Sequence, residues 1–131
     1  MTLTNLLCYH LQADGGTRCA CINAAMLAIA EAGIPVRDLM AACAAGYLDS
    51  TSILDMNYME DSGGGPDVAV AIHPNLDKTV LLQMDNKIAV DVFEGVYGLA
   101  EQGCKAVAQY MRQQLLAHVQ RLAVMRGPTR L

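Results

Sequence analysis

The sequence contains no apolar run long enough to cross a lipid bilayer. Its longest such run, Ala24 to Ala30, is far shorter than the roughly 20 residues that a transmembrane helix needs, so no contact with a membrane is expected. The first ten residues, MTLTNLLCYH, also lack the basic start and the small-residue cleavage site of a signal peptide. The five cysteines form an odd set without the spacing of zinc ligands, which predicts reduced thiols in an intracellular compartment.

Charged residues are scarce as well. They make up 17% of the 131 residues, whereas hydrophobic residues make up 53%. This balance excludes a disordered tail, because such segments are polar and strongly charged. The chain has no internal repeat, low-complexity tract or linker, and its length suits one domain or a fragment of a larger one. We therefore expect residues 1–131 to form a single unit.

Acidic residues are absent from the C-terminal segment. From Lys105 to Leu131 the chain has five basic residues and no acid. Such a segment can contact a nucleic-acid backbone, but a solvated helix face with a frayed tail is the simpler interpretation and the one we favour. The five basic residues are Lys105, Arg112, Arg121, Arg126 and Arg130.

The apolar and turn residues predict an α+β domain that begins with a buried helix. Residues Cys19 to Ala32 are apolar nearly all round, which predicts a helix covered on most sides that ends at Gly33, with Pro35 just beyond. Residues Leu39 to Ile53 predict two strands bent at Gly46, although a helix fits the alanines equally well.

The second half of the chain predicts further strands and a long helix. Asn57 to Pro66 is expected to be a loop, followed by strands at Val68–His73 and Thr79–Met84. A turn at Asp85-Asn86-Lys87 is expected to join the second of these to Ile88-Ala89-Val90.

Apolar residues then recur at three- and four-residue steps, which predicts a helix from about Asp91 to Val124. Asp91 is its expected N-cap, Glu94 completes a capping box, and Gly127-Pro128 ends it. The expected inner face contains Val92, Val96, Leu99, Ala100, Val107, Tyr110, Met111 and Leu115.

The segment Gln12 to Cys21, QADGGTRCAC, opens the predicted buried helix. Two glycines, Thr17 and Arg18 at a helix start suit an anion site, because the unpaired N–H groups, the helix dipole and a guanidinium converge there. A turn followed by a plain helix cap is the alternative.

A second cluster is Glu60-Asp61 followed by Asp67, with three glycines and a proline between. The glycines let two carboxylates approach one point, as a hard cation or a proton transfer requires. A solvated acidic turn is the alternative. Together, the two clusters suit metal-assisted attack by or on a phosphate.

Cysteines and histidines predict no site of their own. Cys19 and Cys21 are two residues apart on a helix and lie on different faces, while His10, His73 and His118 lack any partner spacing. Core thiols are the expected role of the cysteines.

The order of several motifs resembles the RNase PH family, most of all the catalytic-type RNase PH-like subunits of the exosome ring in their archaeal and plant-like form. The resemblance covers residues 11–125, leaves 126–131 as a tail, and corresponds to the C-terminal half of the family's domain. The N-terminal half, with its own strands and RNA-binding arginines, is expected to be missing, and residues 1–10 differ from the family's strand at that point. The motifs are QADGGTR, INAA, AGIPVRDL, AACAAGYLDST, LDMNYMEDSGGGPDVAVAI and LLQMD.

The resemblance implies a partial RNase PH-like fold, of the ribosomal protein S5 domain 2-like type, and a set of site residues. The family's phosphate-binding motif falls on Gly16, Thr17 and Arg18, its catalytic aspartate on Asp61, and a second aspartate on Asp67. Arg18 acts in catalysis with Asp61, and Asp61 and Asp67 lie near a Mg²⁺ or similar ion. Inorganic phosphate is the implied co-substrate.

The implied partners are other RNase PH-like subunits in a hetero-oligomeric ring and the 3′ ends of single-stranded RNA, in the cytoplasm and, in a eukaryote, the nucleus and nucleolus. Three hypotheses follow: a phosphorolytic 3′→5′ exoribonuclease subunit, a non-catalytic ring or scaffold component, and a small-molecule phosphate-binding enzyme domain. Because half a domain leaves apolar faces uncovered, the isolated chain is expected to be poorly stable or oligomeric.

Overall fold

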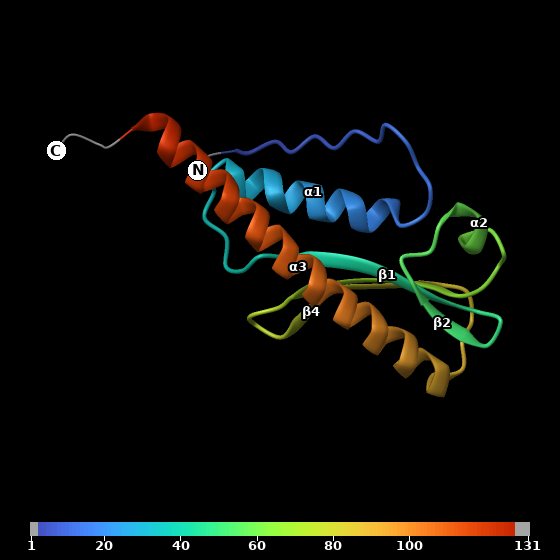
Figure 1. The fold of residues 1–131 in the computed structure, drawn as a ribbon. Helices are drawn as coiled ribbons and strands as arrows, with labels where there is room; N and C mark the ends of the chain where they lie inside the picture. Colours follow the sequence, from blue (N-terminus) through green and yellow to red (C-terminus); the bar gives the residue numbers. More distant parts are fainter. Residues whose placement is uncertain (1–2, 128–131) are drawn as a thin grey trace.

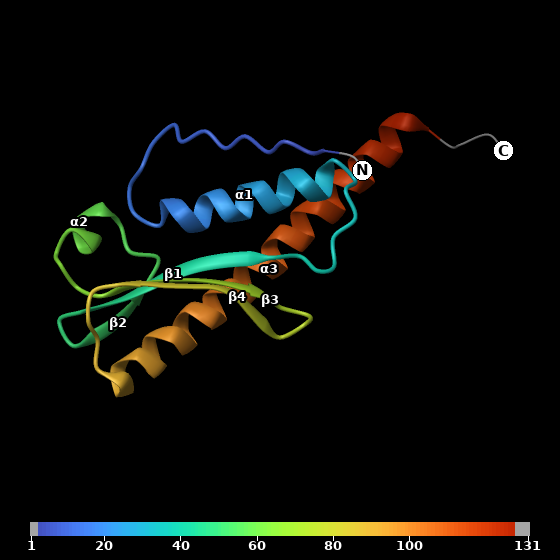
Figure 2. The ribbon, with the colours of Figure 1, turned by 180° about the vertical axis from the view of Figure 1, so that it is seen from behind.

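A four-stranded antiparallel sheet lies between two helices in the computed structural model, which describes residues 3–127 (Figures 1 and 2). The strands are arranged in the order β2-β1-β3-β4. No helix in the described part of the chain is both long and apolar enough to cross a membrane. In chain order the elements are α1 (Thr17–Glu31), β1 (Ala41–Leu48), β2 (Thr51–Leu54), α2 (Tyr58–Asp61), β3 (Asp67–His73), β4 (Lys78–Asp85) and α3 (Val90–Arg126).

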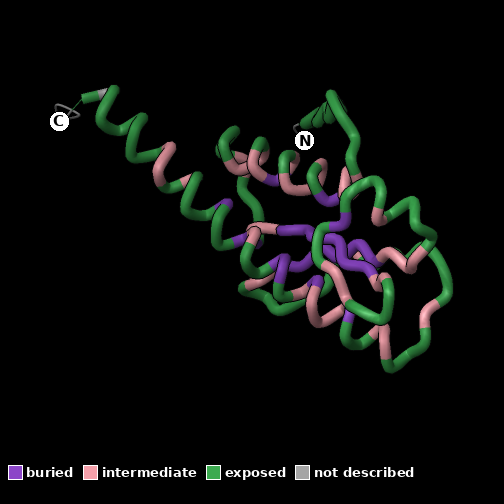
Figure 3. The backbone as a smooth tube through the Cα atoms, turned by 45° about the vertical axis from the view of Figure 1, so that its right-hand side comes forward, coloured by how far each residue is buried: buried purple, intermediate pink, exposed green. Residues whose placement is uncertain are grey.

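The core lies on both faces of β1 and β3, whose buried residues are purple in Figure 3. Side chains alternate along a strand, so Ala42 and Ala44 pack toward Cys19 of α1. Cys43 and Ala45 instead join a cluster with β3 and the middle of α3. The run of alanines therefore serves packing on two sides, since small side chains allow both helices to approach the sheet closely.

Helix α1 is confirmed, and its end is the one the sequence predicts. Gly33 has φ +70°, and its N–H donates to the carbonyl of Ala30 at 3.1 Å, while Ile34 N–H donates to Ile29 at 3.2 Å. These two hydrogen bonds form a Schellman motif. The expectation of burial on most sides is wrong, because only Cys19 and Met26 of α1 are buried. One face of the helix contacts the sheet, and its alanines tolerate either environment.

The two strands predicted between Leu39 and Ile53 are present, but the bend is not at Gly46. The chain reverses at Asp49-Ser50, which have φ +47° and +62°, as two-residue hairpin turns require. Gly46 lies inside β1, where a Cβ would be 2.2 Å from Cε of Met56. Its role is close packing rather than a turn.

The segment predicted as a loop, Asn57 to Pro66, contains the short helix α2. Asn57 caps it: Oδ1 of Asn57 accepts hydrogen bonds from Met59 N and Glu60 N at 2.9 and 3.0 Å, and Oε2 of Glu60 accepts one from Asn57 N at 2.9 Å. This capping box is visible in the sequence as Asn-x-x-Glu, but the neighbouring glycines obscured it.

The strands at 68–73 and 79–84 are confirmed, whereas the strand at 88–90 is wrong because α3 begins at Val90. The N-cap is Ala89 and Asp91 sits in the first turn, so the capping box with Glu94 does not form. Gly127 ends the helix with φ +68°, and Pro128 lies outside the described residues.

The inner face of α3 differs in part from the predicted one. Val96, Ala100 and Met111 are buried as expected, but Tyr110 is 62% exposed. Three small residues that the pattern passed over, Gly103, Cys104 and Ala108, are buried on this face.

Candidate active site

Both clusters predicted from the sequence line one cavity of about 180 Å³. It lies where the start of α1, the end of α2 and the start of β3 meet. Arg18, Asp61 and Asp67 all line it, whereas Glu60 is engaged in the cap of α2. The full lining is Ala13, Gly15, Gly16, Thr17, Arg18, Cys19, Ala44, Tyr58, Asp61, Asp67 and Ala69.

Two glycines set the approach of the chain to α1. Gly15 and Gly16 have φ +78° and +55°, a region that side chains with a Cβ rarely adopt. A Cβ on Gly15 would lie 2.2 Å from the carbonyl oxygen of Met56, so only glycine allows this loop to approach the segment before α2. No side chain caps α1 at Gly16. The first N–H groups of the helix therefore remain available to an anion.

Arg18 projects from the first turn of α1 toward two carboxylates. Its Nη2 lies 3.4 Å from Oδ2 of Asp67 and 3.0 Å from Oδ2 of Asp85. Asp85 was not among the predicted site residues, because the sequence indicates only a turn there. Its position follows from the strand register, which pairs Asp67 with Asp85 across β3 and β4. Arg18 is 43% exposed and Asp85 58% exposed, so their ion pair contributes at most about 1 kcal/mol.

Asp67 is the most enclosed of these acids, with 14% of its side chain exposed. Burial, followed by the nearby charge of Asp61, raises the pKa of Asp67 above its ordinary value, and Asp85 adds to this effect while Arg18 opposes it. Burial and the charge of Asp61 both favour the protonated form of Asp67. A cation or a proton is therefore favoured at the carboxylates.

The loop before α1 and helix α2 are also joined directly. Oδ1 of Asp14 accepts a hydrogen bond from Tyr58 N at 3.2 Å, and Asp61 N donates to the carbonyl of Asn57 at 3.0 Å. These contacts hold the helix that carries Asp61 against the start of α1. The distance between the anion cradle and Asp61 is thus set by backbone contacts rather than by side chains alone.

The donor set suits a hard divalent cation. Within residues 3–127, no third acid, cysteine or histidine completes a tight group with Asp61 and Asp67. Two carboxylates with water and substrate oxygens are a common set for Mg²⁺. Thus Asp61 and Asp67 are the residues that could hold such an ion.

Cys19 lines the cavity but is poorly suited to be a nucleophile. Burial, with smaller contributions from Cys43 and Asp67, raises the pKa of Cys19 to about 11. The thiol therefore stays protonated at neutral pH. The cavity's chemistry depends on charge and position, not on covalent attack by a side chain.

The described basic side chains of the C-terminal segment, those of Lys105, Arg112 and Arg121, do not line this cavity. Lys105 pairs with Glu101 at 2.6 Å, Arg112 donates to Asn75 at 3.3 Å, and Arg121 Nε donates to a carbonyl of its own helix at 3.4 Å. All three lie on the exposed surface of α3. The side chain of Arg126 and the whole of Arg130 lie outside the described residues.

Comparison with known proteins points to one family. Residues 38–103 match the profile of the 3′ exoribonuclease family, domain 2. The exosome complex component RRP41 homolog of Arabidopsis thaliana is 59% identical over 117 residues, which cover 89% of this chain and 48% of that protein. Exosome complex component Rrp41 of Thermococcus kodakarensis is 52% identical over 105 residues, covering 80% of this chain and 42% of the relative.

The mouse exosome complex component RRP41 is 42% identical over 117 residues, again covering 89% of this chain and 48% of the relative. The chain thus spans about half the length of the curated relatives it matches. The crystal structure of rice Rrp46 superposes with a TM-score of 0.70 at 23% identity, over 80% of this chain and 49% of that one. At that identity, the likeness concerns the fold.

Proposed function

The chain belongs to the 3′ exoribonuclease family, whose second domain it contains, and from this premise we propose that it forms part of an RNase PH-like exosome subunit that degrades RNA from its 3′ end with inorganic phosphate. The observation that carries the proposal is the single cavity that unites Gly16, Thr17 and Arg18 with Asp61 and Asp67. The names of the RRP41 relatives support assembly in an exosome complex.

Arg18 and the first N–H groups of α1 hold the phosphate. The guanidinium has several donors in one plane, and only Nη2 contacts Asp67 and Asp85, so the remaining N–H groups can bind the anion. Gly16 keeps the approach open because it has no side chain, and Thr17 lines the same wall. An oxygen of the bound phosphate then faces the cavity in which Asp61 lies.

In the proposed reaction, this oxygen attacks the phosphorus of the last phosphodiester of the RNA. A P–O bond forms to the incoming phosphate, and the bond between phosphorus and the 3′ oxygen of the preceding nucleotide breaks. The products are a nucleoside diphosphate and an RNA shortened by one nucleotide with a free 3′ hydroxyl. Orientation and charge stabilisation supply most of such catalysis, which agrees with a cavity whose only thiol is protonated.

Asp61 assists the departure of the 3′ oxygen, either as proton donor or by positioning an ion. Asp67 lines the same cavity and lies 3.4 Å from Arg18. Together these two aspartates would hold Mg²⁺, which neutralises charge on phosphoryl oxygens when bound. Arg18, Asp61 and Asp67 would thus act on the phosphates from the walls of one cavity.

The proposal includes its setting in the cell. Other RNase PH-like subunits are the expected partners in a hetero-oligomeric ring, and 3′ ends of single-stranded RNA are the substrate. The expected location is intracellular, in the cytoplasm and, in a eukaryote, in the nucleus and nucleolus. Ring partners are part of the proposed active form.

An RNA-decay assay on the chain co-purified with RNase PH-like subunits tests this function. Single-stranded RNA labelled at its 5′ end should shorten only when phosphate is present and release nucleoside diphosphates. Co-purification without phosphate-dependent decay would instead support a scaffold role. Release of monophosphates would exclude phosphorolysis, and failure to co-purify would favour a small-molecule enzyme that binds phosphate.

A further inference from the structure

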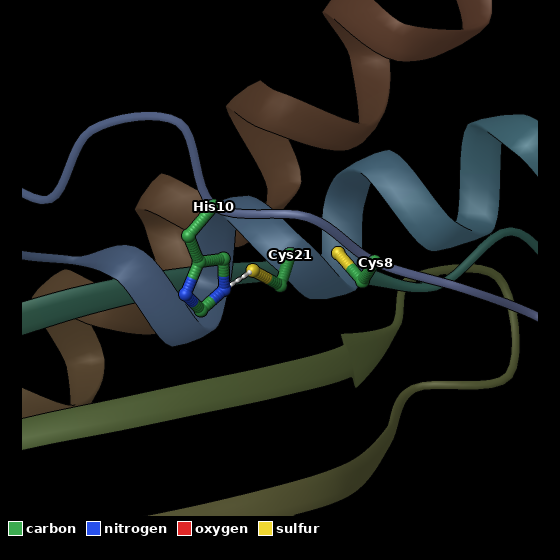
Figure 4. Close-up of side chains that lie close together, drawn as sticks. All are labelled: Cys8, His10 and Cys21. Carbon is green, nitrogen blue, oxygen red and sulfur yellow. Dashed lines mark hydrogen bonds between the residues drawn. The ribbon is translucent and has the colours of Figure 1, made fainter.

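A group of three metal-binding side chains lies outside the candidate active site. Cys8 and His10 come from the segment before α1, and Cys21 comes from the second turn of α1 (Figure 4). One potential ligand atom from each lies within 4.8 Å of the others. Nε2 of His10 and Sγ of Cys21 are hydrogen-bonded at 2.5 Å, and Figure 4 shows the Cys21 thiol between His10 and Cys8.

The path of the chain explains why spacing along the sequence gave no sign of this group. The N-terminal segment runs back along the outer side of α1 in both ribbon views (Figures 1 and 2). Cys19 is buried toward the sheet, and Cys21, two residues later, lies on another face of the helix. There it meets Cys8 and His10, beside a hollow of about 410 Å³ that all three residues line.

We propose that Cys8, His10 and Cys21 bind one Zn²⁺ ion, with two thiolates and one imidazole as ligands and water in the fourth position. Sulfur and imidazole donors select Zn²⁺ over the hard cations that carboxylates prefer. Three protein ligands and an open position form a known class of zinc site. Cys8 and His10 are exposed and Cys21 is half-buried, so water can reach the fourth position.

Charge balance supports a cation at this position. The ligand atoms of Cys8 and Cys21 lie within 4.8 Å of each other, so two thiolates there would repel each other without a cation. A divalent ion compensates both charges, and the thiol protons are released when it binds. The ion itself therefore supplies the positive charge that two adjacent thiolates need.

The site would also anchor a segment that has few contacts of its own. Residues 3–13 form no helix or strand, and Leu3, Leu7 and Leu11 are 84%, 75% and 99% exposed. A metal bridge from Cys8 and His10 to Cys21 fixes this segment to α1. Cys21 lies one helical turn after Thr17, and the hollow beside the anchor shares Gly15 and Thr17 with the lining of the candidate active site.

Cobalt provides a direct test on the reduced full-length chain, because Co²⁺ replaces Zn²⁺ and its charge-transfer absorption requires thiolate ligands. The chain should bind one equivalent of Co²⁺ with this absorption, and Zn²⁺ should displace it. Three variants, C8S, H10A and C21S, each remove one ligand. Each should lower Zn²⁺ affinity by more than the roughly 10- to 100-fold decrease that follows loss of a residue that only contacts a ligand. C19A and H118A are the matched controls, each removing one thiol or imidazole elsewhere, and should bind as the unaltered chain does.

Alkylation of the unaltered chain gives a second readout that needs no variant to fold. One equivalent of Zn²⁺ should protect Cys8 and Cys21 from iodoacetamide, as mapped by mass spectrometry, whereas Mg²⁺ should not. Either of two results would overturn the proposal. The first is reduced protein that shows neither thiolate–cobalt absorption nor protection of Cys8 and Cys21 from iodoacetamide. The second is unchanged affinity in both C8S and C21S.

Discussion

Arg18 is the residue whose surroundings most constrain the proposed chemistry. It is the cation that offsets part of the carboxylate charge around the cavity, since it lies 3.4 Å from Asp67 and 3.0 Å from Asp85. It is also placed to bind the incoming phosphate. A single side chain thus balances two acids and one substrate anion, so its removal should affect phosphate more than RNA.

We expect Arg18→Ala to raise the phosphate concentration needed for half-maximal decay by roughly 10- to 100-fold, because a hydrogen bond to a charged group is worth about 1.5–3 kcal/mol. Turnover should also fall, since the attacking anion is less well positioned. Steady-state decay rates of the assembled ring across a phosphate series measure both. Arg37→Ala, which removes an exposed arginine outside the cavity, should leave the phosphate dependence unchanged.

Asp61→Asn tests the second proposed role at the cavity, which is assistance to the departing 3′ oxygen. The change keeps the size of the side chain but removes its charge and its capacity to donate a proton. Turnover should fall by roughly 10²-fold or more, as is typical for loss of general acid–base catalysis, while RNA binding persists.

Single-turnover decay measures the rate of the Asp61→Asn variant, and filter binding of the same RNA measures its affinity. Asp77→Asn is the control, because Asp77 is exposed with φ +49° and asparagine tolerates that conformation. Full activity of Asp61→Asn would remove Asp61 from the mechanism and leave the scaffold interpretation.

The side-chain amide of Asn23 in α1 makes hydrogen bonds to the backbone of Ala42 in β1, as a neighbouring strand would. Asn23 Nδ2 donates to the carbonyl of Ala42 at 2.9 Å, and Ala42 N donates to Asn23 Oδ1 at 2.8 Å. Ala42 is 1% exposed, so its backbone groups would be left unpaired in Asn23→Ala. We expect a loss of about 1–3 kcal/mol in the free energy of unfolding, measured by urea titration. Asn5→Ala, at an exposed position, should change it little.

Asp38 joins the loop before β1 to the turn between β3 and β4. It is 8% exposed, and it accepts hydrogen bonds from Leu39 N, Asn75 N, Asn75 Nδ2 and Leu76 N at 2.8, 2.9, 2.7 and 3.2 Å. Burial alone would raise the pKa of Asp38, but the bonds from Asn75, Leu39 and Leu76 outweigh it and hold the pKa below its ordinary value.

The stabilisation from Asp38 should therefore depend on pH. Because the folded pKa is the lower one, the carboxylate stabilises the fold above the unfolded value of about 3.9, and this contribution is lost as pH falls through the folded pKa. Near neutral pH, Asp38→Asn should cost about 1.5–3 kcal/mol. Urea midpoints of both proteins should converge at acid pH. Asp49→Asn, a change of charge in an exposed turn, should keep a constant difference.

Local backbone chemistry made some elements predictable from sequence. Gly33 ends α1 as expected, because a left-handed residue after a helix leaves few alternatives to glycine. Gly46 misled the prediction, because a glycine that admits Met56 looks the same in sequence as one that makes a turn. The end of β1 depends on Asp49 and Ser50, which form a turn without glycine.

The candidate site, too, was predictable from the sequence only in part. Gly16, Thr17, Arg18, Asp61 and Asp67 lie in short runs with recognisable chemistry, and all five line one cavity. The remaining participants depend on topology. Asp85 reaches Arg18 through strand register, and Cys8 and His10 reach Cys21 because the N-terminal segment doubles back, neither of which is encoded by local spacing.

At the scale of the whole molecule, one stretch of uncovered apolar surface lies on the edge strand β4. The two helices cover β1 and β3 on opposite faces, whereas Val80, Leu82 and Met84 are 50%, 49% and 44% exposed. β4 also has only β3 as a neighbour, so its outer backbone groups are free to pair with another strand. β4 is therefore one location at which the isolated chain can self-associate.

We expect the isolated chain to dimerise through β4. Antiparallel pairing of β4 with a second copy brings the end that carries Lys78 beside the end that carries Asp85, so the strand is complementary in charge to itself. Sedimentation velocity should show a concentration-dependent shift from monomer to dimer. Leu82→Lys should abolish it, because it brings a charge to the centre of the pairing. Lys78→Glu should weaken it by about 0.2–1 kcal/mol per end, as a like-charge cross-strand pair does. Lys87→Glu is the control, because it makes the same change of net charge outside the strand. Equal weakening of the dimer by Lys87→Glu and Lys78→Glu would rule out pairing at β4. A monomer at every concentration would also rule it out.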